Sequence, residues 1–256
     1  MPYLARRVGQ ALVVLVLAFT VTFVLLQALP GDAILIKFES PELGLSPAQI
    51  ADIRSSYGAD VPAWQQYLHT VSGFLVGDFG YSVQYGTPVH ELLAVALPET
   101  IALAGLGFLV AVLIAIAVAF LSTLAPFGWL RQALRSLPGV FVSVPVFWLG
   151  IVLIQVFSFQ LKLVPVIGAD PLQALILPVL TLAIPISAPL AQVLSRAIDD
   201  VQLTPFVAVV RAKGAGPARV LWRDVARNAL LPTITIAGVL IGELIGGAVV
   251  TETVFG

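Results

Sequence analysis

Apolar residues occur along the chain in long blocks, and charged residues gather in the stretches between them. Five blocks of about 20 residues or more contain at most one charged residue each. A helix of about 20 apolar residues is long enough to cross a bilayer. We therefore predict an all-α, polytopic membrane protein whose five transmembrane helices lie at residues 8–30, 100–123, 137–158, 172–196 and 231–251.

Prolines and glycines interrupt the later blocks. A proline in a membrane helix removes a backbone hydrogen bond, which is tolerated only where neighbours or a water-lined cavity satisfy the backbone. The prolines of the third and fourth spans are therefore either packing kinks or parts of a pathway; they are Pro138, Pro145, Pro178, Pro185 and Pro189. In the fifth span, Gly238, Gly242 and Gly246 recur every fourth residue, which favours close packing of another helix.

The composition agrees with a membrane protein. Of the 256 residues, 59% are hydrophobic and 11% are charged, whereas a soluble domain carries about 25% charged residues. The absence of cysteine excludes disulfides, thiolate metal sites and cysteine nucleophiles. A net charge of −1 gives no reason to expect nucleic acid as a partner.

The distribution of basic residues predicts the orientation. With a cytoplasmic N-terminus and five spans, ten Lys and Arg residues fall on the inner side and three, Lys37, Arg54 and Lys162, on the outer side. Cytoplasmic loops are enriched in these residues. The first span follows Arg6 and Arg7 and lacks a cleavage site, so we interpret it as an uncleaved anchor in a multi-pass, bacterial-type inner membrane protein.

The longest segment between spans, residues 31–98, is then external. It is moderately acidic. Ser46, Pro47 and Gln49 have the pattern of a helix start, which predicts a helix at residues 47–56, and a second helix is expected at residues 63–75. We interpret this segment as a small outer cap.

A basic segment lies within the loop at residues 197–230, and we call residues 204–230 the basic hinge. Thr204 and Pro205 predict a short helix that ends near Ala212. Residues 214–216 are Gly-Ala-Gly and predict a break, after which Pro217 begins a second helix.

The second helix of the basic hinge is amphipathic. Arg219, Arg223 and Arg227 share one face. The opposite face is apolar and consists of Ala218, Leu221, Trp222, Val225 and Ala229. The arginines either anchor the topology and contact membrane lipid phosphates, or they belong to a docking element for a partner protein. Topology requires only charge, so the break and the apolar face favour docking.

The hinge also carries a family resemblance. Arg211-Ala212-Lys213-Gly214, with Arg219–Leu221 and Arg227–Pro232, resembles the cytoplasmic loop of permeases in ABC importers of the dipeptide/oligopeptide/nickel type. Further motifs resemble the same family in the same order: Tyr3–Arg7, Leu29–Asp32, Gly77–Gly80, Pro88-Val89, Leu97–Thr100 and Ile176–Ala183. The resemblance covers nearly the whole chain.

This resemblance implies a single permease domain that forms the translocation pathway for peptides or related small solutes, such as nickel chelates. The hinge would be the coupling element for separate ATPase subunits, which would bind ATP and Mg²⁺. The coupling residues would be Ala208, Arg211, Ala212, Lys213, Gly214, Ala215, Arg219 and Arg223. The other implied partners are a second, different permease and an extracytoplasmic substrate-binding protein. The family closes with another helix, so we expect a sixth span beyond residue 256.

The chain shows no chemistry of its own. It has no Gly-x-x-x-x-Gly-Lys-Ser/Thr loop for phosphates, and His69 and His90 lack metal-ligand spacing, so we expect neither an enzyme nor a metal site. Glu243 is the one ionisable residue deep in a span and is a candidate pathway residue. The alternative is a self-contained carrier or channel that uses Glu243 as a proton or cation site; a purely structural subunit comes third.

Overall fold

The computed structural model describes residues 2–28, 61–80, 82, 85–165 and 170–255. The chain divides into two compact units, Met1–Ala96 and Leu97–Gly256, which we describe separately. The described residues are largely helical and contain no strand. Four helices, and a fifth element made of two helices joined at a bend, are long and apolar enough to cross a membrane. The all-α, polytopic fold is therefore confirmed. The helix expected at residues 47–56 lies outside the described residues.

In the first unit, helix α1 (Pro2–Ala28) packs beside helix α4 (Ala63–Val76). The hydroxyls of Thr20 and Tyr67 share a hydrogen bond of 2.8 Å. The rings of Phe19 and Phe23 lie 5.5 and 5.3 Å from the Tyr67 ring. Helix α1 covers residues 8–28 of the predicted first span, whose last two residues lie outside the described ones, and α4 covers the helix expected at residues 63–75.

Helix α5 (Val89–Leu124) is longer than the predicted span at residues 100–123. It includes Pro98, the predicted last residue of the external segment. The residues before Pro98 are strong helix formers such as Leu92, Leu93 and Ala94. The helix therefore continues through the proline with the loss of one backbone hydrogen bond.

The third span differs from the prediction of one helix at residues 137–158. It consists of α6 (Gly128–Ser143), then α7 (Val146–Leu153) and the π-helical segment η2 (Ile154–Gln160), with a bend of 105° between them. Val144 and Pro145 at the bend have extended backbone angles. Proline disfavours the helical conformation of the residue before it, and at this proline the chain turns at Val144. Pro138 remains inside α6.

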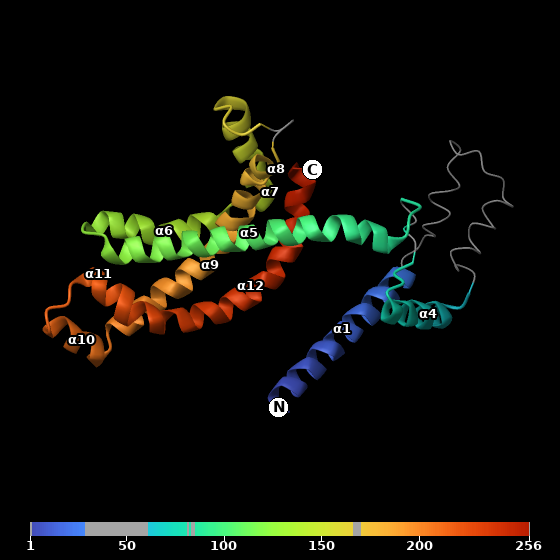
Figure 1. Ribbon diagram of the computed structural model, residues 1–256, viewed down its shortest axis with the longest axis horizontal. Helices are drawn as coiled ribbons and strands as arrows, with labels where there is room; N and C mark the ends of the chain where they lie inside the picture. The colour runs from blue at the N-terminus through green and yellow to red at the C-terminus, as the bar shows by residue number, and fades with distance from the viewer. Residues whose placement is uncertain (1, 29–60, 81, 83–84, 166–169, 256) are drawn as a thin grey trace. The chain divides into compact units, whose positions relative to one another are not determined.

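Helix α9 (Ile176–Gln202) is the central helix of the second unit and follows the single turn α8 (Pro171–Ala174). It contacts α6, α7 and α12, and Figure 1 shows it crossing the bundle among them. A Cβ atom on Gly107 of α5 would lie 3.3 Å from the Cβ atom of Leu182, so α5 and α9 also approach closely. Pro185 and Pro189 are accommodated within α9.

The last helix, α12 (Ala226–Phe255), begins before the predicted fifth span at residues 231–251 and runs through Pro232. It continues directly from α11 (Pro217–Arg219) and the π-helical segment η3 (Val220–Val225). The second helix of the basic hinge and the fifth span are therefore one continuous helical rod. Helix α10 (Pro205–Ala212) precedes this rod, and α10 and α11 lie together at one end of the unit (Figure 1).

Candidate functional site

The basic hinge has the helix–break–helix shape that its sequence predicts. Thr204 is extended and Pro205 occupies the first turn of α10. After Lys213 the chain reverses at Gly214, whose φ of 84° lies in the left-handed region that favours glycine. Gly216 then precedes α11. The hinge is thus a defined structural element.

One side of the hinge is buried in an apolar cluster that we call the loop core. Val207 of α10 and Val220, Leu221 and Val225 of η3 are almost completely buried there. They pack against α5, α9 and the start of α12, through Ala119, Phe120, Leu194, Ala197, Ile198, Ala226 and Ala229. The hinge is therefore joined to the membrane helices by close packing, and a force on it reaches those helices directly.

The apolar face of the second hinge helix is only partly as predicted. Leu221, Val225 and Ala229 are buried, but Ala218 is exposed and Trp222 is 65% exposed. The π-helical turn η3 explains the difference, because its bonds reach the fifth preceding residue instead of the fourth and so rotate the face. Trp222 instead contacts Phe120 of α5 edge-on, with ring centroids 4.7 Å apart.

The residues predicted to form the docking surface lie mostly on the opposite, exposed side of the hinge. All of them are exposed except Ala215, which is half-buried against the loop core: Ala208, Arg211, Ala212, Lys213, Gly214, Arg219 and Arg223. Arg211 donates a hydrogen bond of 2.6 Å from Nη2 to Oε1 of Gln202 on α9. The hinge thus presents a basic surface on a rigid apolar base.

A second feature is a cavity of about 590 Å³ between the α6–α7 bend, α9 and α12, which we call the central cavity. Its walls are mainly apolar and include Pro145, Pro185 and Pro189. Glu243 is the one charged residue among its lining residues. The structure therefore places three of the five singled-out prolines and Glu243 around one space.

A third feature, the basic cavity, has a volume of about 490 Å³ and lies between α6 and α9. Arg135, Arg196 and Asp199 line it, and Nη2 of Arg135 lies 2.7 Å from Oδ1 of Asp199. Gln192 of α9 lines both the basic and the central cavity. Sequence reasoning missed Gln192; its signal was an amide in an apolar span, seven residues after Pro185 and so on the same helix face.

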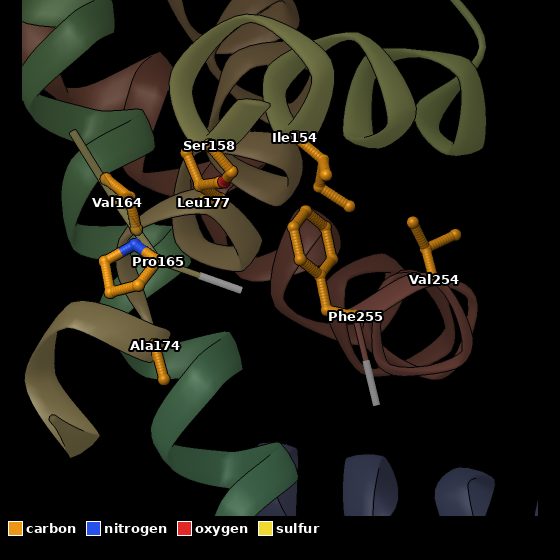
Figure 2. A pocket seen from close by; sticks show the side chains of 8 residues that line it. All are labelled: Ile154, Ser158, Val164, Pro165, Ala174, Leu177, Val254 and Phe255. Carbon is orange, nitrogen blue, oxygen red and sulfur yellow. The ribbon is translucent and has the colours of Figure 1, made fainter. Parts of the chain in front are cut away.

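Polar groups also occur near the end of α12. Thr100 of α5 donates a hydrogen bond of 2.7 Å to Oε1 of Glu252, a contact that the sequence did not indicate. Nearby, a cavity of about 90 Å³ lies between η2, the start of α9 and the end of α12, and Figure 2 shows Phe255 and Ser158 at its walls. In the described part of the chain, the Ser158 hydroxyl has no hydrogen-bond partner, and no cluster of His, Asp and Glu could hold a metal ion.

Comparison with known families accounts for nearly the whole chain. Residues 107–256 match the family described as the inner membrane component of binding-protein-dependent transport systems, and residues 1–104 match the N-terminal part of such components. The chain belongs to this family. Membership confirms the resemblance to ABC importer permeases and supports a translocation-pathway subunit over a self-contained carrier.

Individual relatives agree with this assignment. The chain is 33% identical to the oligopeptide transport system permease protein AppB of Bacillus subtilis and 32% identical to a probable peptide ABC transporter permease, y4tP, of Sinorhizobium fredii. It is 31% identical to the glutathione transport system permease protein GsiC of Escherichia coli. Each alignment covers 99% of this chain and 82–83% of the relative.

Proposed function

We propose that this permease subunit imports peptides or small peptide-like solutes, and that separate ATPase subunits bind the basic hinge and supply the energy for import. ATP and Mg²⁺ bind to those subunits, because this chain has no phosphate-binding loop. The names of three relatives, which refer to peptide, oligopeptide and glutathione transport, support the substrate class.

The loop core is the observation that carries the coupling role. A loop that only anchors topology needs charge and no buried base. Here Val207, Val220 and Val225 fix the hinge to α5, α9 and α12, while Arg211, Lys213 and Arg219 face outward. An ATPase subunit that moves the hinge would therefore move three membrane helices together.

The remaining partners follow from the family and from the charge distribution. We propose a cytoplasmic N-terminus, which places the hinge on the same side as the ATPase subunits. A second, different permease completes the pathway. An extracytoplasmic substrate-binding protein delivers the solute, and the family's description as binding-protein-dependent supports this partner.

The test is the number of ATP molecules hydrolysed per peptide imported by the complete transporter in vesicles. Gly214→Pro should uncouple the two processes, because proline cannot adopt the φ of 84° at this turn. A charge reversal at both Arg211 and Lys213 should act in the same way without altering the backbone. Arg131→Glu, at the start of α6 outside the hinge, is the control.

Purification of the tagged wild type from native membranes gives an independent result. Vanadate-sensitive ATPase activity that co-purifies with the tag must come from a docked partner. Transport-competent material with no ATPase activity, or hinge variants with wild-type coupling, would contradict the proposal.

A further inference from the structure

The central cavity and the basic cavity are adjacent, because Gln192 lines both, and their charged side chains are of opposite sign. Glu243 is the charged lining residue of the central cavity. The basic cavity contains two arginines and one aspartate, and Asp199 is already paired with Arg135. No ion pair joins Arg196 to a described residue. Among the residues that the structure describes, Glu243 and Arg196 are therefore the lining side chains of opposite charge type that no ion pair engages.

The separation of these two charges can be estimated along α9. Leu240 of α12 packs with Ala183 and Leu190, and Gly247 lies beside Leu182, so Glu243, between them, is level with about Ile186. Ile186 also lines the central cavity. From Ile186 to Arg196 the helix rises about 15 Å, at about 1.5 Å per residue.

The space between the charges has the chemistry to receive an extended backbone. Gln192 lies between the two levels and lines both cavities, and its amide can donate and accept hydrogen bonds. Pro189 has no N–H, which leaves the carbonyl of Pro185, a lining residue of the central cavity at the level of Glu243, without its usual helical donor. The apolar walls can accept side chains of varied size.

We propose that the two cavities together bind a zwitterionic peptide in an extended form, with its amino terminus at Glu243 and its carboxylate at Arg196. This assignment rests on the proposed function. At about 3.5 Å per residue, a chain of about four residues spans 15 Å. A phospholipid headgroup fits less well, because its amine and phosphate are too close together to reach both groups.

The experiment measures uptake kcat/KM of one tetrapeptide in three forms: unmodified, N-acetylated and C-amidated. The complete transporter in vesicles carries either wild-type permease, Glu243→Gln or Arg196→Gln. Matched controls are Glu99→Gln on α5 and Arg131→Gln on α6, which remove the same charges outside both cavities. The binding protein is the same throughout, so its own preference for free termini cancels in each comparison between variants.

Each variant should lose selectivity at one end of the peptide. Glu243→Gln should lower kcat/KM for the unmodified peptide about tenfold and for the acetylated peptide less than about twofold, since only a free amine makes a charge-assisted bond to Glu243. Arg196→Gln should likewise lower kcat/KM about tenfold for the unmodified peptide and less than about twofold for the amidated peptide, which has no carboxylate to pair with Arg196. The two control variants should leave kcat/KM unchanged for all three forms of the peptide.

Other outcomes separate this inference from the proposed function. If wild type hydrolyses ATP but imports no peptide, the peptide assignment fails and the inference with it. If wild type imports the peptide and a variant lowers kcat/KM equally for all three forms of the peptide, only the inference is overturned. An Arg196→Gln effect that follows the anionic lipid content of the vesicles, and not the peptide carboxylate, would assign Arg196 to a lipid and also overturn it.

Discussion

Helices α9 and α12 have nearly the same mean hydropathy but very different surroundings. The most apolar window of the span that contains α9 has a mean hydropathy of 2.1, and that of the span ending in α12 has a value of 2.0. Yet 56% of the first window is buried inside the chain, and 17% of the second. Hydropathy measures transfer out of water and does not distinguish lipid from protein as the new environment.

The contacts of the two helices show what the difference means. Helix α9 packs against neighbours on several sides, and residues such as Ala183 and Leu190 are fully buried. On α12 the buried residues form one stripe, and a Cβ atom added at Gly238, Gly242 or Gly246 would have no neighbour within 4 Å. Helix α9 therefore holds this subunit together, and most of the surface of α12 is left for the membrane or for the rest of a transporter.

The same leucine-to-alanine change in each helix gives the largest expected contrast. Leu190→Ala in α9 should lower stability by about 2 kcal/mol, because it opens a cavity at a fully buried site. Leu231→Ala in α12, where the side chain is 66% exposed, should change stability by less than about 0.5 kcal/mol. Thermal unfolding of the purified subunit in detergent measures both, and equal shifts would refute the contrast.

Glycine-to-alanine changes should lower stability where another helix lies close to the glycine and raise stability where the space around the glycine is open. At Gly107 of α5, the new Cβ would lie 3.3 Å from Cβ of Leu182 in α9, so we expect a loss of about 1 kcal/mol. At Gly242 of α12, the space is open and alanine should raise stability by about 0.5 kcal/mol, since it favours the helix. Gly105→Ala, two residues before Gly107 and also open, is the control within α5. The same unfolding measurement decides the signs.

The segment η3, which leads directly into α12, contacts α5 through an aromatic pair, and this pair tests how firmly η3 is attached. Trp222→Leu should lower stability by about 1 kcal/mol through loss of the edge-on contact with Phe120. Trp129→Leu is the matched control, because Trp129 stacks only on its near neighbour Phe127. A double-mutant cycle between Phe120 and Trp222 that gives no coupling energy would show that the contact does not stabilise the hinge.

The smallest effect is expected where α9 meets α6 through charge. The ion pair of Arg135 and Asp199 is about 40% exposed on both sides, and exposed pairs contribute about 0.5 kcal/mol. Arg135→Gln and Asp199→Asn, singly and together, should give a coupling energy of this size that decreases in high salt. A coupling above about 2 kcal/mol would mean that this pair, and not apolar packing, joins the two helices.

Much of the fold could be predicted because apolar block length directly reflects bilayer thickness. The positions of α1, α5, α9 and α12 follow from it. The limits of the helices were harder to predict, because proline has no fixed effect. The helix continues through Pro98 and Pro232, whereas the chain turns at Pro145. The difference depends on the helical tendency of the flanking residues and on tertiary packing, which short-range patterns do not encode.

For the candidate site, the shape of the hinge could be predicted from its caps and glycines. The cavities could not, because they depend on contacts between distant residues such as Gln192, Glu243 and Arg135. Trp222 contacts Phe120 of the loop core but is more exposed than its predicted face implies, because a π-helical turn changes the helical period that the prediction assumed. A single sequence reveals neither contacts between distant residues nor a local change of helical period.

The loop core also determines when the subunit can complete its folding during synthesis. Its members extend from Ala119 to Ala229, and at about 5–20 residues per second roughly ten seconds separate their translation. Until then Phe120 has no partner from η3, and its helix must remain in the bilayer or with an insertion factor. A ribosome-stalled chain that ends before Val220 should therefore leave position 120 open to crosslinking, and a chain extended well past Ala229 should protect it.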